Sequence, residues 1–223
     1  MTAAQQSRSY SPERLAYWYF RLNGFLTTEN FIVHPDTGSN QRTDADLLAI
    51  RFAYRRENLQ RPMIDDPMVT SCSTFVNVII AEVKTGICEI NGPWSSPEAD
   101  NLKRVLKAIG CVPDSSVDVV CTALYQEGRW SNTEVTIRLF AIGERRNETL
   151  PIVLRQQVTW DDVIAFCIKR FVAYRRQKIS VGQWTDDGRE LMYRALAGDP
   201  KSRIRQLFGL RLDSTFIDRG DER

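Results

Sequence analysis

The sequence of 223 residues has very little histidine, since His34 is the only one. A single histidine cannot by itself build a zinc site, and no G-x-S-x-G stretch is present to carry the serine of a hydrolase. We therefore interpret His34, which ends a short apolar run before a turn, as structural or at most as a phosphate contact. Zinc enzymes and serine hydrolases are the two classes that this shortage argues against.

Paired cysteines are also missing. The five cysteines are odd in number and scattered, with no C-x-x-C pair among Cys72, Cys88, Cys111, Cys121 and Cys167. Four of them lie in or beside apolar segments, which is typical of reduced thiols packed in a protein core. Neither a disulfide framework nor a structural zinc site is therefore expected.

The chain contains neither a long apolar run nor a strong excess of one charge. No stretch approaches the roughly 20 apolar residues of a membrane span, and the N-terminal MTAAQQSRSYSPER has no apolar core of the signal-peptide type. These features favour a cytoplasmic protein with no membrane partner. With 30 basic and 28 acidic residues the formal net charge is +2, which excludes a histone-like polycation but permits a local basic patch.

What the chain does contain is a regular succession of helical and extended patterns. Hydrophobic residues make up 43% of it, which is enough for one sizeable domain. Ser11, Pro12 and Glu13 have the order of an N-cap, a first helical residue and a first-turn acid, so they predict a helix that ends near Asn23. The pattern after it predicts three strands, a helix, two strands and three helices, at 31–33, 46–52, 75–84, 97–109, 117–125, 133–142, 159–178, 185–196 and 200–208.

These elements predict an α/β protein with three parts. Residues 1–10 are expected to form a disordered tail, residues 11–150 an α/β core, and residues 151–223 a helical extension packed on that core. The polar connection from Tyr54 to Ser73 is long for a compact domain, which suggests a functional flap or a partly mobile excursion.

Three charged residues lie at the ends of two apolar strands. In IIAEVKTG, Glu82 and Lys84 are two residues apart and therefore point to the same face of a strand. Asp46 opens the preceding strand in DADLLAI, so antiparallel pairing would place it beside Glu82. Two carboxylates that close repel each other unless a hard cation such as Mg²⁺ mediates, and a lysine can balance charge that builds on a phosphate. Two acids and a lysine at one strand edge therefore predict a site for phosphodiester hydrolysis.

The same residues and the order of elements resemble the PD-(D/E)XK nuclease superfamily. A helix, three strands with D-x-L-L-A on the second and E-V-K on the third, then a helix and further strands extend from about Ser11 to Ile142. The resemblance implies an α/β fold with a restriction-endonuclease-like αβββαβ core, in which helices flank a mixed sheet, and here a C-terminal helical segment follows. It also implies that Asp46 and Glu82 bind Mg²⁺ or Mn²⁺ and that Lys84 assists the attacking water.

Further acids could complete or replace this set. Some members of the superfamily add an acid from the first helix, where Glu13 stands here, although a first-turn glutamate more often serves the helix dipole. Asp44 shares a face with Asp46 and is a candidate supporting acid. Asp65 and Asp66 are rival metal ligands, because the stretch before E-x-K is longer than usual. We prefer Asp46, since the apolar residues after it indicate a strand that holds it rigidly.

Basic residues near the predicted site and on a C-terminal helix are candidates for binding a nucleic-acid backbone. They are Arg51, Arg55 and Arg56 after the second strand, and Lys169 and Arg170 on the helix. The leading hypothesis is a magnesium-dependent nuclease that hydrolyses DNA phosphodiester bonds, for which a homodimer would suit cutting both strands. The alternative is a non-catalytic nucleic-acid-binding or protein-interaction subunit that keeps the same fold.

Overall fold

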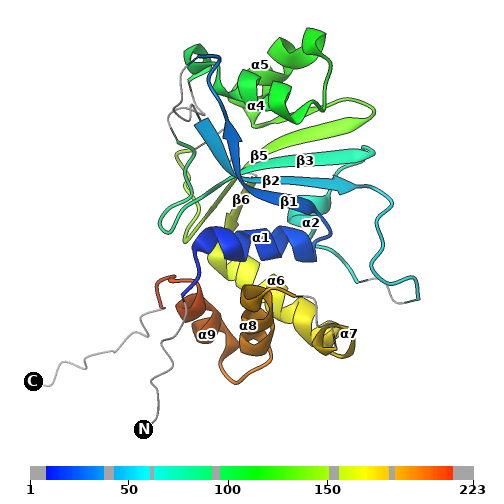
Figure 1. The fold of residues 1–223 in the computed structure, drawn as a ribbon, viewed down its shortest axis with the longest axis vertical. Coiled ribbons are helices and arrows are strands. Elements are labelled where there is room, and N and C mark those ends of the chain that lie inside the picture. Colours follow the sequence, from blue (N-terminus) through cyan, green and yellow to red (C-terminus); the bar gives the residue numbers. More distant parts are fainter. Residues whose placement is uncertain are drawn as a thin grey trace, which may run out of the picture.

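The computed structural model describes residues 9–37, 43–60, 63–91, 96–150, 156–180 and 184–212. The predicted N-terminal tail, residues 1–10, therefore lies almost entirely outside the described residues. Figure 1 shows a twisted sheet with helices on both of its faces. Within the described ranges, no helix combines the length and the apolar character that crossing a membrane requires.

The described residues form one mixed sheet of six strands. The strands are β1 Leu26–Val33, β2 Thr43–Phe52, β3 Val76–Val83, β4 Arg129–Ser131, β5 Val135–Gly143 and β6 Gln157–Thr159. Their order is β1-β2-β3-β5-β4, and β6 also pairs with β5. The pairs β1–β2 and β2–β3 are antiparallel, whereas β3 and β5 are parallel. The general prediction of an α/β fold with a mixed sheet and flanking helices is confirmed.

Each face of the sheet buries its own hydrophobic core. The helices are α1 Pro12–Leu22, α2 Pro67–Thr70, α4 Asn101–Ile109, α5 Val117–Glu127, α6 Trp160–Ala173, α7 Arg175–Ile179, α8 Asp186–Ala195 and α9 Pro200–Leu207, with 3₁₀ turns at Pro97–Ala99 and Asp114–Ser116. On one face, α1, α6, α8 and α9 pack over residues such as Ile79 and Phe140. On the other, α4 and α5 pack over Val78 and Ile137. The two layers lie below and above the sheet in Figure 1.

The helix boundaries follow from local signals in the sequence. α1 begins with Pro12 in its first turn, as predicted. Thr159 caps α6, because its hydroxyl accepts the Asp162 backbone N–H while the Asp162 carboxylate accepts the Thr159 backbone N–H. α6 ends before Tyr174 and a separate α7 follows, so the predicted helix 159–178 is two helices.

The segment 117–125, predicted as a strand, belongs to helix α5. Its buried residues lie three or four positions apart, which is the spacing of one helical face: Val117, Val120, Cys121 and Leu124. Gly128 ends the helix in the left-handed conformation, with a φ of 66°. The strand prediction was wrong because the β-branched residues were given more weight than this periodicity.

Two strands begin earlier than predicted. β1 begins at Leu26 rather than at Phe31, and its residues alternate between exposed and partly buried as in an edge strand. The first half of β1 is mostly polar, so the apolar pattern predicted only its last three residues as a strand. β2 begins at Thr43, so Asp46 lies inside the strand rather than at its start.

Part of the connection after β2 is packed on helices, although Tyr54 and Leu59 of the same connection are 84% and 83% exposed. Asp66 caps α2 by accepting the Met68 backbone N–H at 3.0 Å, and its other carboxylate oxygen accepts the Tyr19 hydroxyl at 2.7 Å. The Met63 backbone N–H donates to the Tyr174 hydroxyl at 2.8 Å. These contacts tie the connection to α1 and to the end of α6.

Candidate active site

β2 and β3 bring Asp46 and Glu82 together. The antiparallel register pairs Leu47 with Ala81, so Asp46 and Glu82 are the next opposed positions. Lys84 follows β3 directly, and its Nζ lies 3.0 Å from Glu82 Oε2. The three residues therefore share one corner of the sheet, at the C-terminal end of β3.

The Asp46 carboxylate is held by the backbone of the neighbouring strand. Its Oδ2 accepts a hydrogen bond of 2.7 Å from the Val83 backbone N–H. The paired residues of β2 and β3 end at Leu47 and Ala81, so this side-chain bond continues the contact between the strands. Burial raises the pKa of Asp46, while the Val83 N–H and the charge of Lys84 act in the opposite direction.

Glu82 is an acid in an unfavourable environment. Only 5% of its side chain is exposed. Burial, followed by the negative charge of Asp46, raises the pKa of Glu82 to about 7, although the ion pair with Lys84 opposes that rise. A cation placed beside both acids would relieve their repulsion and favour both ionised forms.

The backbone of Lys84 is clamped on both sides. Its N–H donates to the Ile142 carbonyl of β5 at 2.8 Å, and its carbonyl accepts the indole N–H of Trp160 at 3.0 Å. Trp160 is fully buried in the first turn of α6. The turn after Lys84 is also packed closely on β5, because a Cβ at Gly143 would lie 2.7 Å from the Gly86 carbonyl oxygen.

Trp160 is the residue of this corner that sequence reasoning missed. The capping box at Thr159 located the start of α6 correctly. It could not indicate which carbonyl the indole N–H would reach, because Lys84 lies 76 residues earlier in the chain. A tryptophan at a helix start is a weak signal on its own.

Two further acids lie within electrostatic reach of the corner. Glu13, in the first turn of α1, and Asp44, on β2, both raise the pKa of Asp46. Asp44 raises the pKa of Glu82 as well. The structure thus places both acids near the candidate ligands, and a metal-binding role for Glu13 stays a prediction.

The rival acids Asp65 and Asp66 have other partners. Asp65 forms ion pairs of 2.7 Å with Arg51 and with Arg170. Asp66 caps α2, as described above. Both carboxylates hold the connection after β2 in place, which favours Asp46 as the partner of the E-x-K residues.

Three of the arginines predicted to contact DNA form ion pairs inside the protein. Arg170 is fully buried and pairs with Glu57 and Asp65. Arg51 and Arg55 also pair with Asp65. The prediction that Arg170 contacts DNA was wrong, because a fully buried guanidinium cannot reach a nucleic-acid backbone. The sequence did not reveal its carboxylate partners, which lie 113 and 105 residues away along the chain.

The other predicted DNA contacts differ in exposure. Arg56 and Lys169 are exposed residues, and their contact with DNA stays a prediction. The side chains of Arg51 and Arg55 are 11% and 25% exposed. Their existing ion pairs would have to rearrange before either could bind a phosphate.

The two acids of the corner suit a magnesium or manganese ion. Mg²⁺ keeps several water ligands and needs only one or two carboxylates together with phosphate oxygens. Asp46 and Glu82 supply two such groups, and their repulsion contributes to the raised pKa of Glu82. In the described part of the chain, no three or more histidine, cysteine, aspartate or glutamate side chains are arranged to hold an ion. An ion held by Asp46 and Glu82 would have to complete its coordination with water and substrate.

Comparison with family models, with curated proteins and with solved structures gave no significant match for this chain. The likeness to PD-(D/E)XK nucleases therefore remains one of motif and element order.

Proposed function

We propose that the chain is a metal-dependent nuclease that hydrolyses DNA phosphodiester bonds at the corner formed by Asp46, Glu82 and Lys84. The observation that carries the proposal is the convergence of two carboxylates and a lysine from neighbouring strands. A structural ion pair would need only one carboxylate, and burying a second acid beside it costs stability. Strongly perturbed acids of this kind cluster at functional sites.

Each residue of the corner has a separate role in this proposal. Asp46 and Glu82 would hold Mg²⁺ or Mn²⁺, with Glu13 as a candidate third ligand. When bound, the cation supplies Lewis-acid stabilisation of the phosphate and activation of water. Lys84 keeps its ammonium beside Glu82, where it can orient the attacking water and balance the charge that develops on the phosphate. The clamp by Trp160 limits how far the Lys84 backbone can move.

The order of elements supports the same proposal. The chain has α1, the antiparallel strands β1, β2 and β3, the helices α4 and α5, and then β5 parallel to β3, with the short α2 between β2 and β3 and the short β4 before β5. Apart from α2 and β4, this is the αβββαβ order that the resemblance implies. In the resemblance described above, the metal-binding acids belong to the second and third strands. Asp46 on β2 and Glu82 on β3 have these places.

One observation favours the alternative of a non-catalytic nucleic-acid-binding or protein-interaction subunit. Glu82 is almost enclosed and already paired with Lys84, so the corner could serve stability or partner binding without turnover. The two functions differ in their need for metal. A binding subunit would associate with DNA in a salt-dependent manner and would not require a divalent cation.

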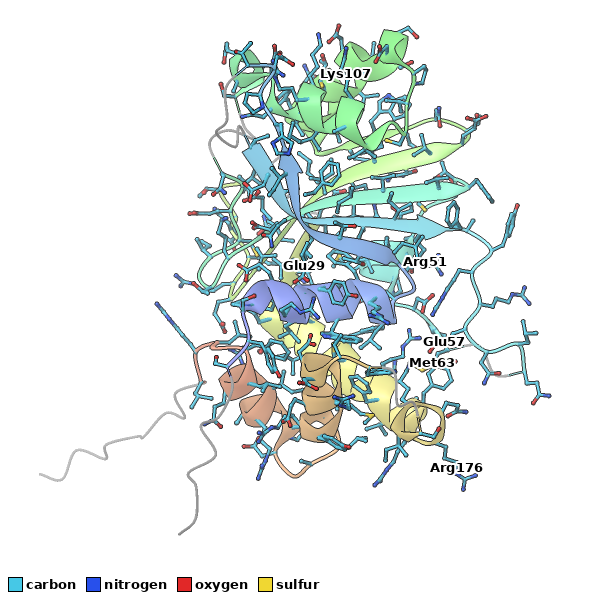
Figure 2. The ribbon with its side chains drawn as sticks, in the orientation of Figure 1. Glu29, Arg51, Glu57, Met63, Lys107 and Arg176 are labelled. Atoms are coloured by element: carbon cyan, nitrogen blue, oxygen red, sulfur yellow. The ribbon has the colours of Figure 1, made fainter. Side chains whose placement is uncertain are left out.

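The proposal is tested by cleavage of labelled duplex and single-stranded DNA, with and without Mg²⁺ or Mn²⁺. Asp46→Asn and Lys84→Met should each lower the cleavage rate by at least about 100-fold, because each removes a group that stabilises the transition state. Glu134→Gln and Lys107→Met are the matched controls and should cleave as the wild type does. Both control residues are exposed, and Figure 2 shows Lys107 on the far side of the sheet from α1.

A second readout needs no DNA. Mg²⁺ should raise the melting temperature of the wild type more than that of Asp46→Asn, since a ligand stabilises the state that binds it. Metal-dependent cleavage that survives both Asp46→Asn and Lys84→Met would remove these residues from the mechanism. DNA binding without turnover in either metal would favour the non-catalytic alternative.

A further inference from the structure

A cavity of about 410 Å³ lies near the opposite end of α1 from the candidate site. α1 begins beside Asp46 with Glu13, and Arg21, which lines the cavity, lies roughly 12 Å further along the helix axis. The other walls come from Arg55, Glu57 and Asn58 after β2 and from α7 with its flanks. In Figure 2, Glu57 lies between the last turn of α1 and α7. The volume is in the range of small-molecule sites.

The lining of this cavity has a surplus of positive charge. It contains Arg21, Arg55 and Lys178, and Glu57 is the one carboxylate among the described residues that line it. Arg21 is an exposed residue whose Nη1 donates to the Tyr17 hydroxyl at 2.8 Å. Within the described ranges it forms no ion pair with a carboxylate. A surplus of two positive charges matches a phosphate monoester, which carries about −1.5 to −2 at neutral pH.

The cationic side chains around Glu57 outnumber the carboxylates that pair with them. Glu57 forms ion pairs with Lys178 at 2.6 Å, with Arg55 at 3.1 Å and with Arg170 at 3.3 Å. The Lys178 side chain is 9% exposed, and its burial lowers its pKa in spite of this ion pair. The Nε of Arg170 is buried and has no hydrogen-bond partner in the described part of the chain. The neighbouring Asp65 also pairs with Arg51, so the two carboxylates serve four cations. A further anion would therefore be stabilised here.

The wall also contains three aromatic residues. Trp18 and Trp184 stack with their ring centroids 5.1 Å apart and 13° between their planes, and Tyr174 also lines the cavity. Arg21 lies over Trp18 at 4.9 Å, and the Lys178 ammonium lies 5.4 Å from the Trp184 ring. Cations and rings are therefore adjacent. A ligand that carries both a ring and an anion would contact both kinds of group, whereas an inorganic ion would contact only one.

We propose that this cavity binds a nucleoside monophosphate. Arg21 and Lys178 would hold the phosphate, and Arg55 would join them by exchanging its ion pairs with Glu57 and Asp65 for the phosphate. The rings of Trp184 and Tyr174 that line the cavity would contact the base. The site is separate from the corner that contains Asp46, and nucleotide binding there would not require nuclease activity.

The test is calorimetric titration of the full chain in EDTA, with AMP and CMP as purine and pyrimidine probes. At least one nucleotide should bind saturably at one site per chain. The matching nucleoside, which lacks the anion, and inorganic phosphate, which lacks the ring, should bind at least about tenfold more weakly.

Substitutions locate the bound nucleotide. Arg21→Ala and Lys178→Met should each weaken binding by at least about tenfold, because each removes one of the three lining cations. Arg176→Ala is the matched control and should bind as the wild type does, since Arg176 is exposed and points away from Glu57 in Figure 2. Arg21→Gln keeps the test decisive if Lys178→Met fails to fold, because Arg21 lies at the surface.

Three results would overturn the proposal. The first is no saturable binding of either nucleotide at millimolar concentration, and the second is equal affinity for inorganic phosphate. The third is binding that Asp46→Asn abolishes while Arg21→Ala leaves it intact, since the nucleotide would then occupy the corner between β2 and β3.

Discussion

Among single residues, Glu82 has the clearest conflict between burial and charge. It is an ionisable side chain at the end of β3, and the preceding positions of that strand are buried and mostly apolar. Burial makes the ionised form of Glu82 unfavourable. The charge of Lys84 offsets part of this cost, whereas the charge of Asp46 adds to it. An amide or an apolar side chain would serve stability better at this position. The stability lost by burying the charge of Glu82 indicates that this residue is kept for a function.

Replacing Glu82 by glutamine should stabilise the metal-free protein at alkaline pH. The pKa of Glu82 is about 7 in the fold against an ordinary value of 4.5, so the folded state holds more protons between these pH values. The stability that depends on this group is therefore greatest below its ordinary pKa and is lost as the pH rises through 7. At pH 8, Glu82→Gln should exceed the wild type by about 3 kcal/mol in free energy of unfolding. At pH 4 the two proteins should be similar.

Urea unfolding in EDTA at several pH values measures this difference. Glu134→Gln, which changes an exposed acid just before β5, is the control and should show no gain that depends on pH. A Glu82→Gln protein no more stable than the wild type at pH 8 would contradict the argument from burial.

Among the elements, the docking of α6 against the end of β3 matters most for the candidate site. The first turn of α6 supplies the indole that holds the Lys84 carbonyl, and β5 supplies the carbonyl that holds the Lys84 N–H. The sequence pattern predicts each of these elements separately, but no pattern predicts that they meet at Lys84. Only the tertiary fold reveals how they are related.

Trp160→Phe should keep the aromatic packing and remove the hydrogen bond to Lys84. A buried carbonyl that loses its donor is expected to lower the free energy of unfolding by about 1–3 kcal/mol. Under the proposed nuclease activity, kcat should fall more than KM changes, because Lys84 loses its clamp and no substrate contact is removed. Urea unfolding and initial rates over a range of DNA concentrations measure the two effects.

The control for this substitution is Trp130→Phe. Trp130 is partly buried and packs against the core on the other face of the sheet. Its replacement should leave kcat unchanged. Equal losses of kcat in both variants would show that the effect of Trp160 comes from general packing.

Sequence patterns predicted some elements well and others poorly. The apolar run of β3, followed by Glu82 and Lys84, was sufficient to predict both the strand and its charged end. Antiparallel pairing with β2 then placed Asp46 correctly, because neighbouring strands joined in sequence usually pair. The helix α5 was mistaken for a strand, since valine is common in strands and the helical spacing of its buried residues was overlooked.

In the molecule as a whole, the C-terminal helices belong to the main hydrophobic core. α6, α8 and α9 bury residues in the same cluster as α1 and one face of the sheet. Arg14 of α1 also joins the two parts, since it pairs with Glu29 of β1 and with Asp187 of α8. Figure 2 shows Glu29 close to α1. The position of α1 therefore depends on residues from both ends of the chain.

Arg170→Met should loosen the connection after β2. Removing the buried guanidinium leaves Glu57 and Asp65 with fewer partners, and breaking a buried ion pair typically costs about 3–5 kcal/mol. Limited digestion with trypsin should then cut after Arg55 or Arg56 faster than in the wild type. Lys169→Met, which changes the exposed neighbour, should alter neither stability nor digestion. Unchanged digestion of Arg170→Met would mean that these ion pairs do not anchor the connection.

This ionic cluster could not have been predicted from the sequence. Charged side chains on a helix usually face solvent, and the basic residues around Arg170 suggested a surface for DNA. Only the tertiary fold brings Glu57 and Asp65 beside that helix, from more than a hundred residues away. Local patterns carry no information about such distant partners.

The strand order has a consequence for how the candidate site assembles during folding. β1, β2 and β3 are neighbours in both sequence and sheet, whereas β5 joins β3 only after the whole 84–134 connection has closed. Pairings between distant segments form slowly, because the entropy of loop closure is lost before the contacts are gained. We therefore expect the carboxylates of Asp46 and Glu82 to meet early and the Lys84 clamp to be completed last. Under the proposed function, the two acids could then bind a cation before Lys84 is held in place.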